Sequence, residues 1–222
     1  MSLLNSHTHV ITEQEYIQGE LLSDIRHEYI DGCVYAMVGA TKKHNVISVN
    51  VTTEIRNQLK HQQSSCNIFT SDMKVRVNGV DSIRYFYPDV MLVCNDHDDT
   101  HDQDDYFQDN PVMIFEVLSN STEKYDKSEK RLAYFSIASL KYYILVEQNK
   151  CEVLVFERRV IDGSDSWQAN YYFLGDDIQF DSLGLTLAVE DIYYQVNAEE
   201  LAQYKKLQAE QEQEVALENK KQ

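Results

Sequence analysis

Two acidic residues stand alone in apolar, strand-like segments of this chain. Asp89 directly follows Pro88 in YPDVMLV, and Glu116 lies in VMIFEVLS. A carboxylate that faces a protein core is costly, and proline cannot donate a hydrogen bond to a neighbouring strand. Each acid could instead end its strand and point to water. For two such acids, one of them fixed by a proline, we favour a chemical role.

Asp89 and Glu116 are 27 residues apart in sequence, so two adjacent strands could bring both carboxylates to one point. Neither apolar segment contains a basic residue that would neutralise its acid. Mg²⁺ prefers oxygen ligands and commonly takes one or two carboxylates, with water and substrate phosphate completing its coordination. We therefore predict that these two acids form a site for Mg²⁺ or Mn²⁺.

The charge of the chain limits its possible partners. The formal net charge is -17, with 37 acidic and 20 basic residues, and the segment 95–105 (NDHDDTHDQDD) contributes six aspartates. Without those six residues the chain would still carry about 11 negative charges. Proteins that bind nucleic acid usually show a basic footprint. Binding to DNA would therefore require local basic groups or a metal ion.

Composition and motifs exclude several other classes of protein. Hydrophobic residues make up 43% of the chain, enough for a core, but no apolar run approaches the roughly 20 residues that span a bilayer. The N-terminus shows no secretory signal, and no phosphate-binding, dinucleotide or zinc motif is present. The four cysteines are scattered, so we expect reduced, buried thiols in a cytoplasmic protein without a membrane partner.

The pattern of residues predicts an α+β fold. Thr12 to Glu15 form a capping box, and HEYI-DG-CVYA reads as a hairpin with an Asp-Gly turn. Apolar residues spaced by four predict a helix over 41–62. Strands are expected at 67–77, 84–94, 112–118 and in KYYILVEQNKCEVLVFERR, with weaker candidates at 171–174 and 185–189. A helix is expected after Leu118, and 196–222 reads as a polar helical tail outside a domain of residues 1–195.

The segments that carry the two acids belong to an ordered set. They are HEYIDGCVYAMVGATKKHN, SDMKVRV, PD (Pro88–Asp89), EVLS leading into STEKYDKSEK, and SLKYYILVE. This set resembles the PD-(D/E)XK nuclease superfamily, and most closely a large bacterial family of uncharacterised restriction-type endonucleases. The resemblance covers about residues 10 to 195. PD alone is a weak signal, whereas the order of the blocks is specific.

The resemblance implies a restriction-endonuclease-like core, which is a mixed β-sheet flanked by helices. It also implies a Mg²⁺-dependent enzyme that hydrolyses DNA. Asp89, Glu116 and the backbone carbonyl of Val117 would hold the metal. Glu28 occupies the position where the family places an acid near the site, although an exposed strand glutamate is nearly as consistent with its sequence.

The superfamily pattern fails at its lysine. A lysine is expected two residues after Glu116, but Leu118 stands there. A lysine is needed because its ammonium can orient the attacking water and offset charge on the phosphate. Lys130 is the best substitute, since its helical stripe continues through Ala133 and faces protein, whereas Lys127 should be solvated. The alternative is an exposed i,i+4 pair with Asp126, worth a few tenths of a kcal/mol.

Three functions stay open at this point. The leading one is a metal-dependent endonuclease with catalytic residues Asp89, Glu116, Lys130 and Glu28. A nuclease fold that serves only as an interaction module would explain the displaced lysine and the acidity, and a hydrolase of smaller phosphate esters would also fit the charge. His44 and Asp72 are weaker candidates, more consistent with structural roles. The resemblance leaves a homodimer open.

Overall fold

The secondary structure is given by a computed structural model, which describes residues 10–79, 82–94, 106–119 and 123–219. Its helices are α1 Glu13–Glu20, α2 Lys42–His61, α3 Glu123–Tyr125, α4 Arg131–Phe135, α5 Val189–Ile192 and α6 Ala198–Asn219, with a π-helix η1 at Asp126–Lys130 and a 3-10 helix η2 at Asp181–Leu183. Its strands are β1 His27–Ile30, β2 Cys33–Ala36, β3 Cys66–Thr70, β4 Lys74–Asn78, β5 Ile83–Phe86, β6 Val90–Cys94, β7 Phe107–Gln108, β8 Pro111–Leu118, β9 Tyr142–Glu147, β10 Glu152–Ile161, β11 Ser164–Phe173, β12 Asp177–Phe180 and β13 Leu185–Ala188.

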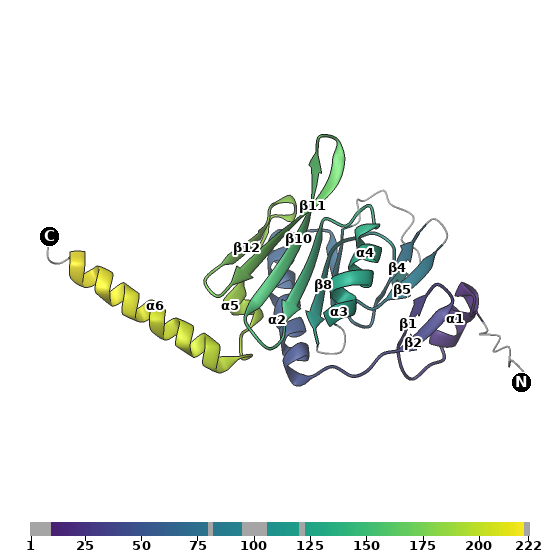
Figure 1. Ribbon diagram of the computed structural model, residues 1–222, viewed down its shortest axis with the longest axis horizontal. Coiled ribbons are helices and arrows are strands. Elements are labelled where there is room, and N and C mark those ends of the chain that lie inside the picture. Colours follow the sequence, from purple (N-terminus) through teal and green to yellow (C-terminus); the bar gives the residue numbers. More distant parts are fainter. Residues whose placement is uncertain (1–9, 80–81, 95–105, 120–122, 220–222) are drawn as a thin grey trace, which may run out of the picture.

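Two mixed sheets and one two-stranded hairpin make up the β-structure (Figure 1). The larger sheet has the order β11-β10-β9-β8-β6-β3, and only its central β8–β9 pair is parallel. The smaller sheet has the order β2-β1-β5-β4-β7, with β4 and β7 parallel. Mixed sheets flanked by helices confirm the predicted α+β architecture, and β12 pairs with β13 apart from both sheets.

Two local predictions from sequence are confirmed. The Thr12 hydroxyl accepts a hydrogen bond from the Glu15 amide while the Glu15 carboxylate accepts one from the Thr12 amide, which completes the capping box of α1. The β1–β2 turn uses Asp31 and Gly32 with φ angles of 49° and 91°. Both residues need a positive φ in this tight type of turn, which explains the Asp-Gly pair.

The chain crosses from one sheet to the other at two adjacent points. We expected continuous strands over 67–77 and 84–94, and both expectations were wrong. The first breaks at Ser71–Met73, between β3 and β4, and the second breaks at Tyr87–Asp89, between β5 and β6. Pro88 lies at the second crossing, where the missing amide hydrogen bond costs no ladder contact.

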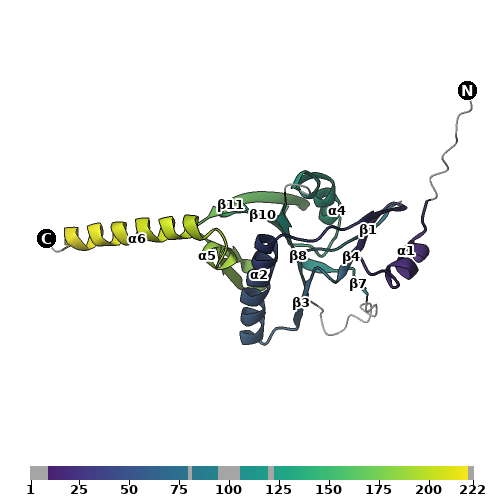
Figure 2. The same cartoon turned by 90° about the horizontal axis from the view of Figure 1, so that it is seen from below.

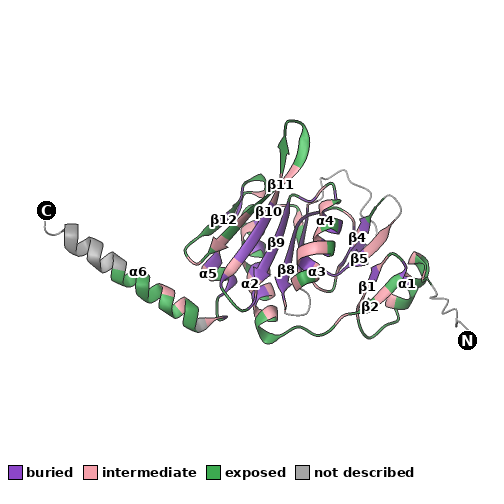
Figure 3. Ribbon diagram, in the orientation of Figure 1, coloured by how far each residue is buried: buried purple, intermediate pink, exposed green. Residues whose placement is uncertain are grey.

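The large sheet is covered on both faces. One face packs against α2 through Ile47, Val51, Ile55 and Leu59. The other face packs against the segment formed by η1 and α4, through residues that include Ala133 and Tyr134. Figure 2 shows α2 and α4 on opposite sides of the sheet, and Figure 3 shows the buried strands between them.

The C-terminal part contains more β-structure than predicted. The whole of 164–173 forms β11, and β12 was missed because its short DIQF segment lies among polar residues. The predicted helical tail is confirmed as α6, which extends away from the sheets (Figure 1). Its first turn contacts the body, since Glu200 accepts a hydrogen bond from the Cys151 amide at 3.2 Å. Residues 1–195 as one domain and 196–222 as an appendage remain our proposal.

The prediction of reduced, buried thiols was wrong for three of the four cysteines and is confirmed for Cys151 alone. Cys66 and Cys94 are register partners on β3 and β6 and form a disulfide, while Cys33 is an exposed free thiol and Cys151 a buried one. Two distant cysteines can meet across neighbouring strands without any local motif, so their spacing gave no signal. Cysteine usage therefore no longer supports a cytoplasmic location.

Two further predictions concern membrane-spanning segments and the acidic insert. Within the residues that the structure covers, no helix has the length and apolar character needed to cross a membrane. The acidic insert at 95–105 lies outside the described residues.

Candidate active site

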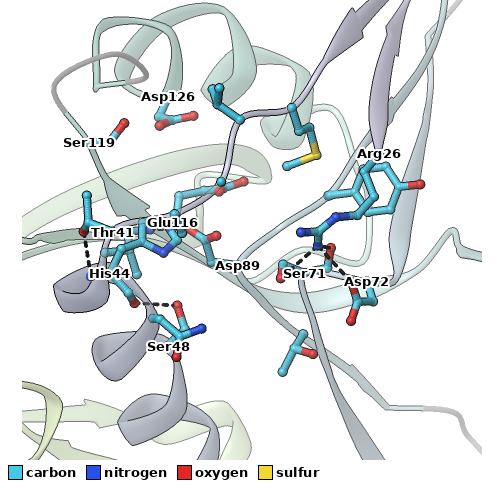
Figure 4. Close-up of a pocket in the computed structure, with 18 of the residues that line it drawn as sticks. Arg26, Thr41, His44, Ser48, Ser71, Asp72, Asp89, Glu116, Ser119 and Asp126 are labelled. Atoms are coloured by element: carbon cyan, nitrogen blue, oxygen red, sulfur yellow. Dashed lines mark hydrogen bonds and ion pairs between the residues drawn. The ribbon is translucent and has the colours of Figure 1, made fainter. Parts of the chain in front are cut away.

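Asp89 and Glu116 lie side by side where two paired strands of the large sheet meet the cleft (Figure 4). Strands β6 and β8 are antiparallel neighbours, with Val90 opposite Phe115, so Asp89 lies one residue before β6 and opposite Glu116. Side chains alternate between the two faces of a strand. Met91 and Ile114 pack on the face covered by α4, and the alternation places Glu116 on this face, while Asp89 lies beside it in the bend just before β6.

The two acids open into one cleft, of about 980 Å³, at the crossing between the sheets. Figure 4 shows them side by side, with His44 next to Asp89 and with Arg26 and Asp72 farther along the cleft. The end of β8, the start of α2 and the connection between β2 and α2 all contribute to the wall. Several elements of regular secondary structure, and not one loop alone, therefore hold the side chains of this site in position.

One oxygen of Asp89 is held in place by two contacts. Its Oδ2 accepts a hydrogen bond from the Val117 amide at 2.7 Å, and His44 Nε2 lies 3.0 Å from the same oxygen. The carboxylate is largely buried, with 12% of its side chain exposed. No contact of Oδ1 is found among the residues that the structure describes. The carboxylate is thus oriented, and one oxygen stays available toward the cleft.

The two carboxylate oxygens of Glu116 also differ in their contacts. Its Oε1 accepts a hydrogen bond from the Tyr134 hydroxyl at 2.9 Å and lies 2.9 Å from Lys130 Nζ. Over the described parts of the chain, Oε2 has no such partner. Both carboxylates line the cleft, and each has one oxygen that described residues do not engage. This neighbouring pair of oxygens is therefore a candidate site for a cation.

Lys130 is buried among acids, as its stripe on the helix predicted. Its Nζ lies 2.9 Å from Glu116, 3.1 Å from Glu28 and 3.8 Å from Asp126. Only 6% of the Lys130 side chain is exposed, and its ammonium also lies over the rings of Phe86 and Tyr134. The structure thus brings Lys130, Glu28 and Glu116 together, so the exposed-pair alternative for Lys130 is wrong.

Lys130 is the last residue of a π-helix. Residues 126–130 form η1, directly before the α-helical turn α4. Such wide turns are rare and occur frequently at functional sites. Here the turn places both Asp126 and Lys130 in the interior, and Tyr143 supports it by donating a hydrogen bond to the Asp126 carbonyl at 3.0 Å.

The electrostatics of the cluster favour an added positive charge. Burial raises the pKa of Glu116 well above its usual range, and the neighbouring Asp89 and Asp126 raise it further, while Lys130 acts in the opposite direction. Burial works against the charge of Lys130, but the attraction of the surrounding acids, Glu116 first, leaves the pKa of this lysine raised as well. Three carboxylates, those of Glu28, Glu116 and Asp126, share the Lys130 ammonium, and Asp89 adds a fourth acid beside Glu116, so like-charge repulsion is incompletely offset.

The donor set fits a hard divalent cation with few protein ligands. Among the described residues, no group of three or more His, Cys, Asp or Glu side chains is arranged to hold a metal. A site with two carboxylate oxygens is sufficient for Mg²⁺, which usually keeps several waters. The Val117 amide points toward Asp89, and within a strand the carbonyl of the same residue faces the same neighbour. That arrangement is compatible with the predicted carbonyl ligand.

The remaining candidate residues differ in whether they contact the two acids. Asp72 pairs with Arg26 at 2.9 Å and its side chain is 87% exposed, so it lies outside the cluster of acids. His44, to which we gave a mainly structural role, contacts Asp89 directly. Lys127 is not simply solvated, because it lies 2.7 Å from Glu123 and 2.9 Å from Glu147. The position of His44 in the first turn of a predicted helix was the available signal, but only the tertiary structure shows its partner.

Comparisons with known proteins identify the family of the chain. The family model described as "Uma2: Putative restriction endonuclease" matches residues 13–190. Uncharacterized protein slr1290 of Synechocystis sp. is 36% identical over 183 residues, which are 82% of this chain and 91% of that protein. Uncharacterized protein sll1609 of the same organism is 33% identical over 141 residues, covering 64% of this chain and 77% of its own.

A solved structure shows the same fold. It is described as "a putative nuclease belonging to DUF820" from Anabaena variabilis, with 15% identity and a TM-score of 0.59 over 77% of this chain and 90% of that one. The family match spans both acids and Lys130, so the chain belongs to the Uma2 family, whose members are described as "Putative restriction endonuclease".

Proposed function

We propose that this protein is a metal-dependent endonuclease that hydrolyses DNA phosphodiester bonds. The observation that carries the proposal is the pair formed by Asp89 and Glu116. Each carboxylate has one oxygen fixed by the protein and the other unengaged by described residues, at the end of a cleft. Family membership supports the reaction class.

The residues of this chain would hold Mg²⁺ or Mn²⁺ through Asp89, Glu116 and the carbonyl of Val117. When bound, such an ion polarises a phosphate oxygen and lowers the pKa of a coordinated water. Lys130 supplies a fixed positive charge beside Glu116, where it can stabilise negative charge on the phosphate or orient the water. Glu28 and Tyr134 hold this ammonium and this carboxylate in position.

The test is the nicking of supercoiled plasmid DNA by the full chain with Mg²⁺ or Mn²⁺. Asp89→Asn and Lys130→Met should each reduce the rate about a hundredfold or more at matched folded fraction. Asp177→Asn is the matched control, because this acid is exposed on β12 and does not line the cleft. A wild-type rate that Asp89→Asn leaves unchanged would refute the proposed site.

Metal binding needs its own measurement. Mg²⁺ or Mn²⁺ should raise the melting temperature of the wild type, because a ligand of the folded state stabilises it by mass action. Asp89→Asn should lose most of this shift, whereas Lys130→Met should keep it, because an ammonium is not a metal ligand. A shift that survives in Asp89→Asn would place the ion elsewhere.

The non-catalytic interaction module is the second candidate. It is favoured by Leu118, which is buried where the superfamily carries its lysine, and by the three acids that already surround Lys130. Metal binding at the acid pair without cleavage of plasmid, linear duplex or single-stranded DNA would support this alternative.

A further inference from the structure

The walls of the cleft offer almost no positive charge for a phosphate backbone. Of the described residues that line it, two are cationic, Arg26 and Lys130, and five are acidic: Glu28, Asp72, Asp89, Glu116 and Asp126. Both cations are already engaged, Arg26 by Asp72 and Lys130 by the buried acids. The chain as a whole carries a formal charge of -17. Affinity for DNA must therefore come from something other than contacts between basic side chains and phosphates.

An aromatic side chain stands next to the acids on the cleft wall. Tyr35 on β2 is the direct cross-strand partner of Glu28 on β1. Directly opposed residues lie on the same face of a pair of strands, with Cβ atoms roughly 5 Å apart. Because Glu28 contacts Lys130 at 3.1 Å, Tyr35 is one side chain removed from the proposed catalytic cluster. It lines the cleft and is 53% exposed, so much of its surface is accessible to a ligand.

The connection from β2 to α2 forms part of the cleft wall. Residues 36–41 continue from Tyr35, and all six line the cleft on their way to His44. Figure 4 shows Thr41 and His44, where this connection ends, on the same side of the cleft as Asp89 and Glu116. The cleft is partly open, and its volume of about 980 Å³ lies within the range of pockets that bind a compact ligand. It suits one or a few nucleotides more than an intact double helix.

We propose that the substrate is unpaired DNA, either a single strand or a frayed end, and that one of its bases stacks on Tyr35. This inference rests on the proposed nuclease function. Duplex DNA carries one charge per roughly 1.7 Å of its axis and hides the faces of its bases, so an acidic cleft can neither attract it nor stack on it. A single strand has a lower charge density, and its bases are free to stack on an aromatic ring.

The experiment compares the cleavage of one labelled oligonucleotide as a single strand and as a blunt duplex, with Mn²⁺. The wild type should cut the single strand at least about tenfold faster. Tyr35→Ala should reduce that rate about tenfold or more, since base stacking on an aromatic residue contributes substantially to binding. Tyr35→Phe should retain most of it, because the ring remains. Tyr171→Ala is the matched control, because Tyr171 is 58% exposed on β11 and does not line the cleft.

Two results would overturn the inference: equal cleavage of both DNA forms, or an unchanged single-strand rate in Tyr35→Ala. If the wild type cuts neither form, the proposed function fails instead. The inference is then decided by binding of the labelled single strand with Ca²⁺. Tyr35→Ala should weaken this binding about tenfold relative to the wild type and to Tyr171→Ala, and equal binding by all three proteins would refute it.

Discussion

The two faces of strand β8 differ in how they are packed. On the face toward α2, Met113, Phe115 and Val117 join an apolar cluster. On the opposite face, Glu116 lies between Ile114 and Leu118 and contacts Lys130. Both faces are buried to the same degree, so solvent does not explain the difference. Apolar packing on the α2 face stabilises the fold. The buried charges on the opposite face lower the stability but form a group that can bind a cation.

The largest expected effect is the loss of the buried ammonium. Lys130→Met leaves Glu116, Glu28 and Asp126 without their shared counter-ion, and breaking a buried ion pair costs about 3–5 kcal/mol. Urea unfolding at neutral pH measures this loss. Part of it should be recovered at acidic pH, where the carboxyl groups become protonated and no longer repel one another.

Phe115→Ala is the matched change on the apolar face. Removing a fully buried aromatic ring also costs about 3–5 kcal/mol. This loss should not depend on pH or on Mg²⁺, because no charge is involved. If the two variants respond to pH in the same way, the contrast between the faces is wrong.

The sequence predicted that Asp89 and Glu116 could meet on adjacent strands and that Lys130 faces protein, but not the contacts that these side chains make. Lone carboxylates in apolar strands are visible without a structure, and the helical stripe through Ala133 correctly predicted that Lys130 is buried. The strand breaks at Ser71–Met73 and at Pro88 were missed, because a change of sheet leaves β-favouring residues on both sides. His44 and the Cys66–Cys94 disulfide depend on pairing between distant segments, for which one sequence carries no local signal.

The second prediction concerns His44, which positions Asp89. His44→Ala removes one of the two contacts to Oδ2 and leaves the Val117 amide as the other. Removing such an orienting partner typically lowers metal affinity by about 10–100-fold. Titration of Mn²⁺ by isothermal calorimetry measures the change. His61→Ala, at the other end of α2, is the control, and equal affinities in the two variants would remove His44 from the site.

The third prediction is the pH dependence of stability without metal. Because its pKa is raised, Glu116 binds a proton more tightly in the folded state than in the unfolded state. Its contribution to stability therefore falls as pH rises from the unfolded pKa toward the folded one. Glu116→Gln cannot ionise, so it should lose less stability than the wild type between about pH 5 and pH 8. Equal losses in the wild type and the variant would show that Lys130 keeps Glu116 ionised over this pH range.

The smallest expected effect separates two lysines of the same π-helical turn. Lys127 also contacts two acids, Glu123 and Glu147, but 37% of its side chain is exposed, compared with 6% for Lys130. Water screens such pairs, and exposed ion pairs contribute about 0–1 kcal/mol. Lys127→Met should therefore change the free energy of unfolding by less than about 1 kcal/mol and leave metal-dependent cleavage unchanged. Suppose instead that Lys127→Met loses as much stability as Lys130→Met. Contact with acidic partners would then matter more for these lysines than exclusion from water, and burial would not decide their role.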